Sequence, residues 1–223
     1  MTKSVFITGV GTDIGKTYTS ALIMKKLLQE KYNACYFKPV LSGAENIDGK
    51  LYAGDIEYVK KISGHNADTS LLGSYIFEDA CSPHLASQKA NTPILLDKII
   101  NDYNKLKEKY NYILSEGAGG IICPFSNDDN PIYTKDIIKA LNTNAVLVST
   151  TNLGSINNAM LSIYYMQNHN INIQGIIFNG YTKSMIDDDN IDFILKHTNI
   201  PLLSVISHGE SSIDINIDKL FGE

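Results

Sequence analysis

A glycine-rich segment near the start of the chain, Gly9-Val10-Gly11-Thr12-Asp13-Ile14-Gly15-Lys16-Thr17, constrains the fold more than any other feature. An apolar run at residues 4–8 precedes it, and a helix-forming stretch follows it. In this setting backbone N–H groups can turn toward a phosphate, the helix start attracts negative charge, and a lysine reaches the terminal phosphates. The segment predicts a nucleotide-binding phosphate loop, although its spacing is one residue longer than the strict motif. A glycine-rich turn that binds nothing is the alternative.

Short apolar runs alternate with helix-like stretches along the chain. The apolar runs cover residues 4–8, 34–38, 112–115, 145–149, 175–178 and 202–206, and the helix-like stretches cover residues 15–30, 95–109, 134–141, 156–168 and 188–197. Such apolar runs favour strands covered on both faces. They predict a doubly wound α/β fold with a mainly parallel sheet, helices on both faces and P-loop NTPase-like topology. With no repeat or linker, residues 1–223 are expected to form a single ATP-binding domain.

Composition narrows the choice of partners. The net charge of −5 argues against nucleic acid. No run of about 18 apolar residues occurs, so no membrane span is expected and the protein is predicted to be cytoplasmic. All 19 basic residues are lysine, so neither this chain nor an identical partner can supply an arginine finger.

Charged residues also stand near other predicted strand ends. Lys38 begins KPVLSG, Glu116 begins EGAGG, and Asp55 lies in the irregular stretch between residues 39 and 93, where we expect the substrate site. Taken alone, Lys38 could be a solvated lysine, Asp55 an ordinary loop aspartate, and Glu116 either a metal ligand or a helix-cap acid. Together with the phosphate loop they favour a magnesium–phosphate site, because Mg²⁺ prefers oxygen ligands.

These segments resemble those of the dethiobiotin synthetases. The resemblance covers nearly the whole chain and rests on GVGTDIGKT, KPVLSG, the Gly-Asp pair at 54–55, CSPHLA at 81–86, EGAGGIICPFS at 116–126, LGSINNAM at 153–160 and IIFNG at 176–180. It implies a magnesium-dependent homodimer that uses ATP, CO₂ or bicarbonate, and 7,8-diaminononanoate in biotin biosynthesis. One amine captures CO₂ as a carbamate, the carbamate attacks the γ-phosphate, and the second amine closes the ureido ring. Positioning and electrostatics are expected to supply most of the catalysis.

The resemblance also implies roles for individual residues. The expected nucleotide contacts are Gly11, Thr12, Asp13, Ile14, Gly15, Lys16, Thr17, Tyr18, Asp55, Glu116 and Asn179, with Asn179 reading adenine. The expected magnesium ligands are Thr17, Asp55 and Glu116, and the expected catalytic residues are Lys16, Lys38 and Thr12. Substrate is expected at Ser42, Gly119, Gly120, Leu153 and Asn157, the last two reaching the diamine of the partner subunit at the interface.

The sequence departs from the family pattern at two positions, and two other functions are alternatives. Ser115 ends a strand where the family more often has an apolar residue, and Ser207 replaces a proline near the base pocket, so we expect only modest preference for ATP. His84 is a candidate general base, but a structural or substrate-contacting role is favoured.

One rival function is a ParA- or MinD-like nucleotide switch, whose signature lysine would stand where Gly11 does. The other is an amidoligase-like relative that activates a carboxylate.

Overall fold

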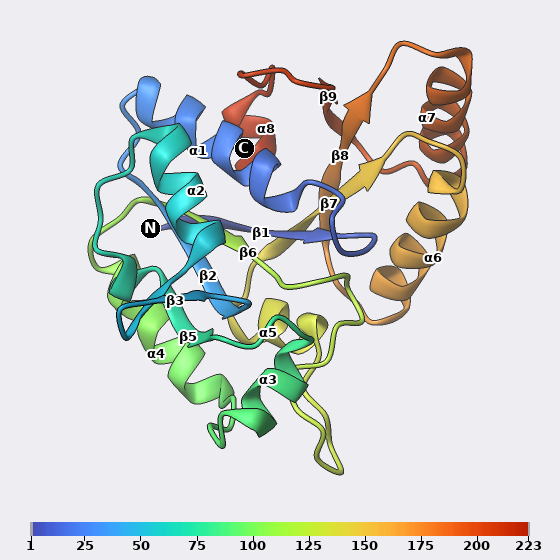
Figure 1. Ribbon diagram of the computed structural model, residues 1–223. Coiled ribbons are helices and arrows are strands. Elements are labelled where there is room, and N and C mark those ends of the chain that lie inside the picture. The colour runs from blue at the N-terminus through green and yellow to red at the C-terminus, as the bar shows by residue number, and fades with distance from the viewer. Residues whose placement is uncertain (1, 223) are drawn as a thin grey trace.

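A seven-stranded sheet forms the centre of the computed structural model, which describes residues 2–222 (Figure 1). The strand order is β5-β2-β6-β1-β7-β8-β9, and all neighbouring strands are parallel. The strands are β1 (Lys3–Gly9), β2 (Ala34–Ser42), β5 (Gly73–Phe77), β6 (Tyr112–Glu116), β7 (Asn144–Thr150), β8 (Ile173–Tyr181) and β9 (Leu202–Ser207). The doubly wound α/β fold is therefore confirmed, and the sheet is wholly rather than mainly parallel.

Helices cover both faces of this sheet (Figure 1). One face carries α1 (Lys16–Gln29), α2 (Gly54–Ser63) and α8 (Ile217–Phe221), and the other carries α4 (Leu96–Lys107), α5 (Thr134–Ala140), α6 (Ser155–Asn168) and α7 (Met185–Thr198). Consecutive strand residues such as Phe6 and Ile7, or Val146 and Leu147, are all buried. A strand covered on both faces requires this continuous apolar run, which explains why the sequence made these strands recognisable.

The region between residues 39 and 93 contains most of the elements that the sequence did not predict. These are β5, α2, the antiparallel hairpin of β3 (Glu45–Ile47) and β4 (Lys50–Tyr52), a short 3₁₀ helix (Thr69–Leu71) and α3 (Pro83–Lys89). The second strand also runs past Lys38 to Ser42, through Pro39. Its pairing with β6 ends at Phe37, after which it pairs with β5 alone. Pro39 thus lies where one side of the strand is already free of ladder hydrogen bonds.

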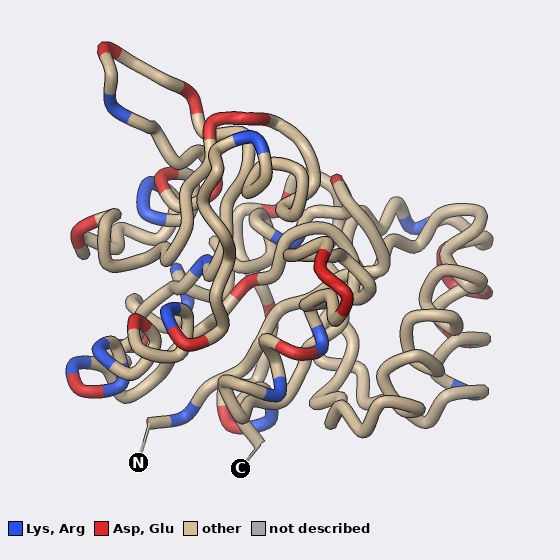
Figure 2. Tube along the Cα trace, turned by 90° about the horizontal axis from the view of Figure 1, so that it is seen from below, with Lys and Arg blue, Asp and Glu red and all other residues tan. Residues whose placement is uncertain are grey.

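Acidic and basic residues are interspersed along much of the chain (Figure 2). Among residues 2–222, no helix combines the length and the apolar character needed to cross a membrane. The three cysteines, Cys35, Cys81 and Cys123, are free thiols.

Candidate functional site

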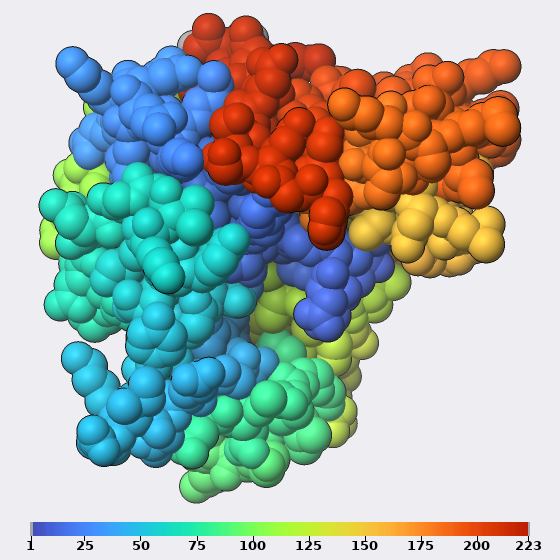
Figure 3. All heavy atoms as spheres, turned by 45° about the horizontal axis from the view of Figure 1, so that its top comes forward, coloured from blue at the N-terminus to red at the C-terminus, as the bar shows by residue number. Residues whose placement is uncertain are grey.

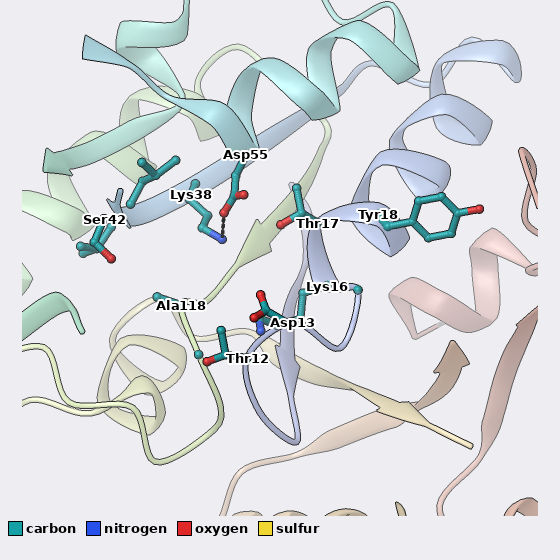
Figure 4. Close-up of a pocket in the computed structure, with 13 residues that line it drawn as sticks. Thr12, Asp13, Lys16, Thr17, Tyr18, Lys38, Ser42, Asp55 and Ala118 are labelled. Atoms are coloured by element: carbon teal, nitrogen blue, oxygen red, sulfur yellow. Dashed lines mark ion pairs between the residues drawn. The ribbon is translucent and has the colours of Figure 1, made fainter. Parts of the chain in front are cut away.

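A cavity of about 500 Å³ lies at the carboxyl ends of β1, β2 and β6 (Figure 4). Parallel α/β sheets bind ligands at this edge, where neighbouring strands send their loops in different directions. Most of the residues expected from the sequence line the cavity, together with three that were not expected, Val40, Leu41 and Ala118. The expected lining residues are Thr12, Asp13, Gly15, Lys16, Thr17, Tyr18, Lys38, Ser42, Asp55 and Gly119.

The phosphate loop connects β1 to α1 in a tightly turned backbone. Asp13 and Gly15 adopt left-handed conformations, with φ of 57° and 88°. A Cβ atom at Gly15 would collide with the side-chain amide of Asn179, so glycine is required there for its conformation and for space. Lys16 begins α1 and is buried, and its Nζ donates to the carbonyl of Gly11 at 2.7 Å. The lysine is therefore held directly over the loop.

Burial lowers the pKa of Lys16 below its ordinary value, and the neighbouring Lys38 lowers it further. Desolvation and a like charge both disfavour the ammonium form, so an anionic ligand placed next to Lys16 would relieve the two effects at once. The environment of this lysine is thus suited to a phosphate group.

Lys38 bridges two carboxylates inside the cavity. Its Nζ lies 2.6 Å from Oε1 of Glu116 and 2.7 Å from Oδ2 of Asp55, and the Asp55 pair is visible in Figure 4. Burial alone would lower the pKa of Lys38, but the carboxylates of Glu116 and Asp55 raise it above its ordinary value. With an exposed fraction of 3%, Lys38 is not the solvated lysine that the sequence left possible.

Glu116 is fully buried and is held by side chains rather than by a helix start. Its Oε1 accepts hydrogen bonds from Thr17 Oγ1 at 2.8 Å and from Lys38 Nζ, and its Oε2 accepts from the Tyr36 hydroxyl at 3.0 Å. The helix that follows, α5, begins only at Thr134. Glu116 therefore does not act as a helix cap.

Asp55 lies in the first turn of α2, not in a loop. Burial tends to raise the pKa of its carboxyl group, but the charge of Lys38 and hydrogen bonds from Lys38 and Thr17 outweigh burial and lower it. Asp55 is thus held ionised beside Glu116, at the edge of the cavity.

The oxygen atoms of Thr17, Asp55 and Glu116 fit a magnesium ion by their chemistry. Two carboxylates already converge on the ammonium of Lys38, so this position favours positive charge. No group of three or more His, Cys, Asp and Glu side chains within residues 2–222 could hold a metal by itself. Mg²⁺ commonly takes one or two carboxylates and completes its shell with phosphate oxygens and water, which matches this incomplete set.

Ser42 and Gly119 of the EGAGG segment also line the cavity, and Gly120 follows Gly119 directly. The Ser42 hydroxyl donates to the carbonyl of Cys81 at 2.6 Å, which ties the end of β2 to the CSPHLA segment. Gly119 adopts a left-handed φ of 58°. A Cβ atom at Gly120 would lie 3.3 Å from the carbonyl oxygen of Gly9. The two glycine-rich segments therefore pack closely against each other.

Asn179 and Tyr18 lie on the side of the phosphate loop that faces the C-terminal segment, residues 208–212. Asn179 Nδ2 donates to the carbonyl of Ile14 at 3.0 Å, and the Tyr18 hydroxyl donates to the carbonyl of Glu210. The backbone N–H of Ser207 donates to the Glu210 carboxylate at 3.0 Å. Figure 3 shows the red C-terminal segment lying directly against the blue N-terminal part of the chain.

Leu153, Asn157 and His84 do not line this cavity. Leu153 is 89% exposed in the loop before α6, and Asn157 is exposed on the first turns of that helix. His84 lines a separate cavity of about 290 Å³ together with Ser126 and Asp128. The fold therefore gives His84 no place beside the phosphate loop.

Besides the three unexpected lining residues, sequence reasoning missed Tyr36, which bonds to Glu116. It is fully buried, and its hydroxyl donates to Glu116. A signal was present: Tyr36 stands two residues before Lys38 on one strand, and residues i and i+2 of a strand share a face. The signal was weak, because a buried tyrosine in a strand is more often part of the core.

Comparison with known proteins places the chain among nucleotide-binding enzymes. Residues 3–214 match a family described as an AAA domain. The chain is 42% identical to the ATP-dependent dethiobiotin synthetase BioD of Clostridium botulinum (strain Loch Maree / Type A3), with 99% of this chain and 97% of that protein covered. It is 44% identical to the protein of the same name from Clostridium novyi (strain NT), with 92% and 87% covered.

Solved structures with a similar fold are more distant in sequence. A ParA family ATPase from Chlorobium tepidum TLS superposes with a TM-score of 0.57 at 15% identity, covering 94% of this chain and 86% of that chain. The septum site-determining protein MinD from Pyrococcus horikoshii OT3, complexed with Mg-ADP, gives 0.56 at 18% identity, covering 93% and 82%. These likenesses concern the fold alone, and the nucleotide-switch alternative is no more than a distant structural relationship.

Proposed function

This chain belongs to the family of ATP-dependent dethiobiotin synthetases, and we propose that residues 1–223 form one synthetase domain that makes dethiobiotin from 7,8-diaminononanoate, CO₂ and ATP. The protein is a ligase of biotin biosynthesis. The observation that carries this function is that Lys16, Lys38 and Asp55 line one cavity at the phosphate loop, where Lys38 pairs with the carboxylates of Asp55 and Glu116.

The reaction needs charge stabilisation more than it needs a side-chain nucleophile. One amine of the substrate adds to CO₂ and loses a proton, giving a carbamate. A carbamate oxygen attacks the γ-phosphorus of ATP, and ADP leaves. The second amine then attacks the carbonyl carbon, and phosphate leaves with the oxygen that the carbamate supplied. Each step places negative charge near the phosphate loop, which a preorganised electropositive site stabilises.

Lys16 and Thr12 are positioned to serve the phosphates. The arrival of a γ-phosphate would draw the Lys16 ammonium away from the carbonyl of Gly11, which accepts its hydrogen bond here. Thr12 lies on the cavity wall, in the phosphate loop. Exchanging a neutral carbonyl for an anionic oxygen strengthens the hydrogen bond, and the loop retains its shape because Gly15 and Asn179 are packed together.

Lys38 is the residue best placed to meet the carbamate. Lys38 lines the cavity between the proposed magnesium ligands and Ser42. It is close enough to Lys16 for its positive charge to lower the pKa of Lys16. Thr17, Asp55 and Glu116 would hold magnesium. When bound, Mg²⁺ would offset the negative charge that develops on the phosphate oxygens. The backbone of Gly119 and Gly120, and the hydroxyl of Ser42, complete the proposed substrate contacts.

The diamine site is proposed to include a second copy of the chain. Leu153 and Asn157 stand on the surface and do not line the cavity at the phosphate loop, although they match the family segment for the diamine. In a symmetric dimer each subunit can lend this segment to the cavity of its partner. The side chain of Leu153 is 89% exposed and is therefore accessible to a partner subunit.

Asn179 is proposed to serve both the loop and the base. Its Nδ2 group is engaged by the carbonyl of Ile14, which leaves the Oδ1 oxygen to accept a hydrogen bond from the exocyclic amine of adenine. Tyr18 and the C-terminal segment at Glu210 flank the same side of the loop.

Substrate-dependent ATP turnover tests the proposal. Purified protein should release phosphate rapidly only when the diamine, bicarbonate and Mg²⁺ are all present, with one dethiobiotin formed for each ATP consumed. ATP turnover that ignores the diamine would favour the nucleotide-switch alternative. Turnover with a carboxylate and an amine in place of bicarbonate would favour the amidoligase alternative.

A further inference from the structure

We propose that Tyr36 is a positioning residue that fixes the Glu116 carboxylate in the orientation required for magnesium binding. The inference rests on the proposed function, because it takes Glu116 as a magnesium ligand. Tyr36 lies outside the motifs that carry the family resemblance, and it is not among the residues that line the cavity.

The two oxygens of Glu116 have different surroundings. Oε1 faces the cavity side and accepts from Thr17 and Lys38, at 2.8 and 2.6 Å. Oε2 faces away and accepts from the Tyr36 hydroxyl at 3.0 Å. The Tyr36 hydroxyl therefore occupies the oxygen that is not needed at the cavity, and this contact determines which oxygen is presented to Thr17.

The sheet itself builds this arrangement. Tyr36 and Lys38 alternate with Phe37 along β2, so both point to the face on which Glu116 lies, while Phe37 points to the other. Tyr36 is paired in register with Leu114 on β6, two residues before Glu116. A tyrosine ring spans that offset and delivers its hydroxyl to the carboxylate, where phenylalanine would fill the same space without a donor.

Burial makes the contact important for function. Glu116 and Tyr36 have no exposed surface, so water cannot replace a hydrogen bond lost between them. Without the hydrogen bond from the Tyr36 hydroxyl, the Glu116 carboxylate can rotate. Its Oε1 atom is then held in place by Lys38 and Thr17 alone. Partners in the second layer around metal sites typically change metal affinity by about 10–100-fold when they are removed.

The test compares nucleotide binding with and without magnesium in Tyr36→Phe. Isothermal titration with ADP, once with excess Mg²⁺ and once with EDTA, gives the factor by which magnesium strengthens ADP binding. We expect this factor to fall by about tenfold in Tyr36→Phe, with ADP affinity in EDTA unchanged. Unchanged factors in wild type and variant would overturn the proposal.

Tyr103→Phe provides a matched control. Tyr103 is 2% exposed, is packed on Phe37 at a ring-centroid distance of 5.8 Å, and also loses one buried hydroxyl on substitution. It should leave the magnesium factor unchanged, whatever it does to the melting temperature. If Tyr36→Phe is too unstable for titration, the rise in melting temperature of the ADP complex on adding Mg²⁺ measures the same linkage.

Glu116→Gln separates this inference from the proposed function. If Glu116→Gln retains the full magnesium factor, Glu116 is not a ligand and the proposed metal site fails. If Glu116→Gln loses the factor but Tyr36→Phe does not, only the positioning role fails. In the double variant, Tyr36→Phe should cause no further loss beyond Glu116→Gln, because its effect passes through that carboxylate.

Discussion

On the side of the sheet formed by β1, β2 and β6, a cluster of charged side chains is buried, whereas the three most exposed large apolar side chains among residues 2–222 lie on the side of β7, α6 and α7. Lys16, Lys38 and Glu116 have exposed fractions of 7%, 3% and 0%. In contrast, Leu153, Leu161 and Met185 are 89%, 61% and 84% exposed. Each side departs from the usual distribution, in which charges face water and large apolar groups do not.

Buried charges and exposed apolar side chains are stabilised in different ways. A buried charge must be paired, and the lysine–carboxylate cluster pairs its own members, so the proposed phosphate and metal would enter a site that is already organised. Exposed apolar side chains are stabilised only when another surface removes them from water, and a second protein can supply that surface. The charge pairing on the first side therefore needs only one chain, whereas the exposed apolar residues on the second side are expected to need a partner.

Lys38→Met should have the largest effect, because it removes the cation shared by two carboxylates. Leaving a buried ion without its partner typically costs about 3–5 kcal/mol, so the free energy of unfolding should fall by that order in urea titrations. Carbamate phosphorylation should also stop, while affinity for an ATP analogue stays similar. The surface variant Lys98→Met, which breaks an exposed pair with Asp102, should change stability by less than about 1 kcal/mol. Equal effects of the two variants would contradict the claim that the Lys38 pairs differ from an exposed ion pair because they are buried.

Lys16→Ala should lower the rate of dethiobiotin formation by about two to three decades, equivalent to about 3–4 kcal/mol of transition-state stabilisation. The fold should persist, because the Lys16 ammonium bonds only to the loop carbonyl of Gly11 among the described residues. Lys26→Ala on the same helix, which loses a surface pair with Glu30, is the control and should remain active. Near-wild-type turnover in folded Lys16→Ala would remove the phosphate-loop assignment.

Asn179→Ala should raise the KM for ATP by about tenfold, equivalent to about 1.4 kcal/mol, with kcat little changed. The effect should be smaller for GTP and CTP if the Oδ1 oxygen reads adenine. An equal loss for all triphosphates would mean that Asn179 acts only through its hydrogen bond to Ile14, in support of the loop. Steady-state kinetics with three nucleotides separates these outcomes.

Mixing inactive Lys16→Ala and Asn157→Ala subunits tests the second side of the molecule. If Asn157 serves the partner's diamine site, one of the two sites in each mixed dimer carries neither change. Random mixing in equal amounts should then restore about a quarter of wild-type activity. Sedimentation must show dimers at the working concentration, and monomers alone would contradict the two-subunit site before any kinetics were measured.

The same contrast explains what the sequence could and could not predict. The central strands were predictable because strands covered on both faces require continuous apolar runs such as Val146–Val148. The phosphate loop was predictable because its glycines are needed for a tight turn within a few residues. By contrast, β5 and α2 depend on what they pack against, and β2 extends beyond the predicted run at residues 34–38 because it continues to pair with β5 after its pairing with β6 ends. The bonds of Glu116 to Tyr36 and Lys38 join residues about 80 positions apart, which no local pattern reveals.

The most direct test of the claim that a carbamate is phosphorylated in this cavity traces oxygen atoms from CO₂ into the released phosphate. In a brief reaction started with ¹⁸O-labelled CO₂, diamine, ATP and Mg²⁺, mass spectrometry of the released phosphate reports which oxygen attacked the γ-phosphorus. If a carbamate is phosphorylated in this cavity, phosphate should carry one ¹⁸O atom for each dethiobiotin formed, and Lys16→Ala should release little labelled phosphate. Unlabelled phosphate would mean that water attacks ATP directly, and this would contradict the synthetase mechanism.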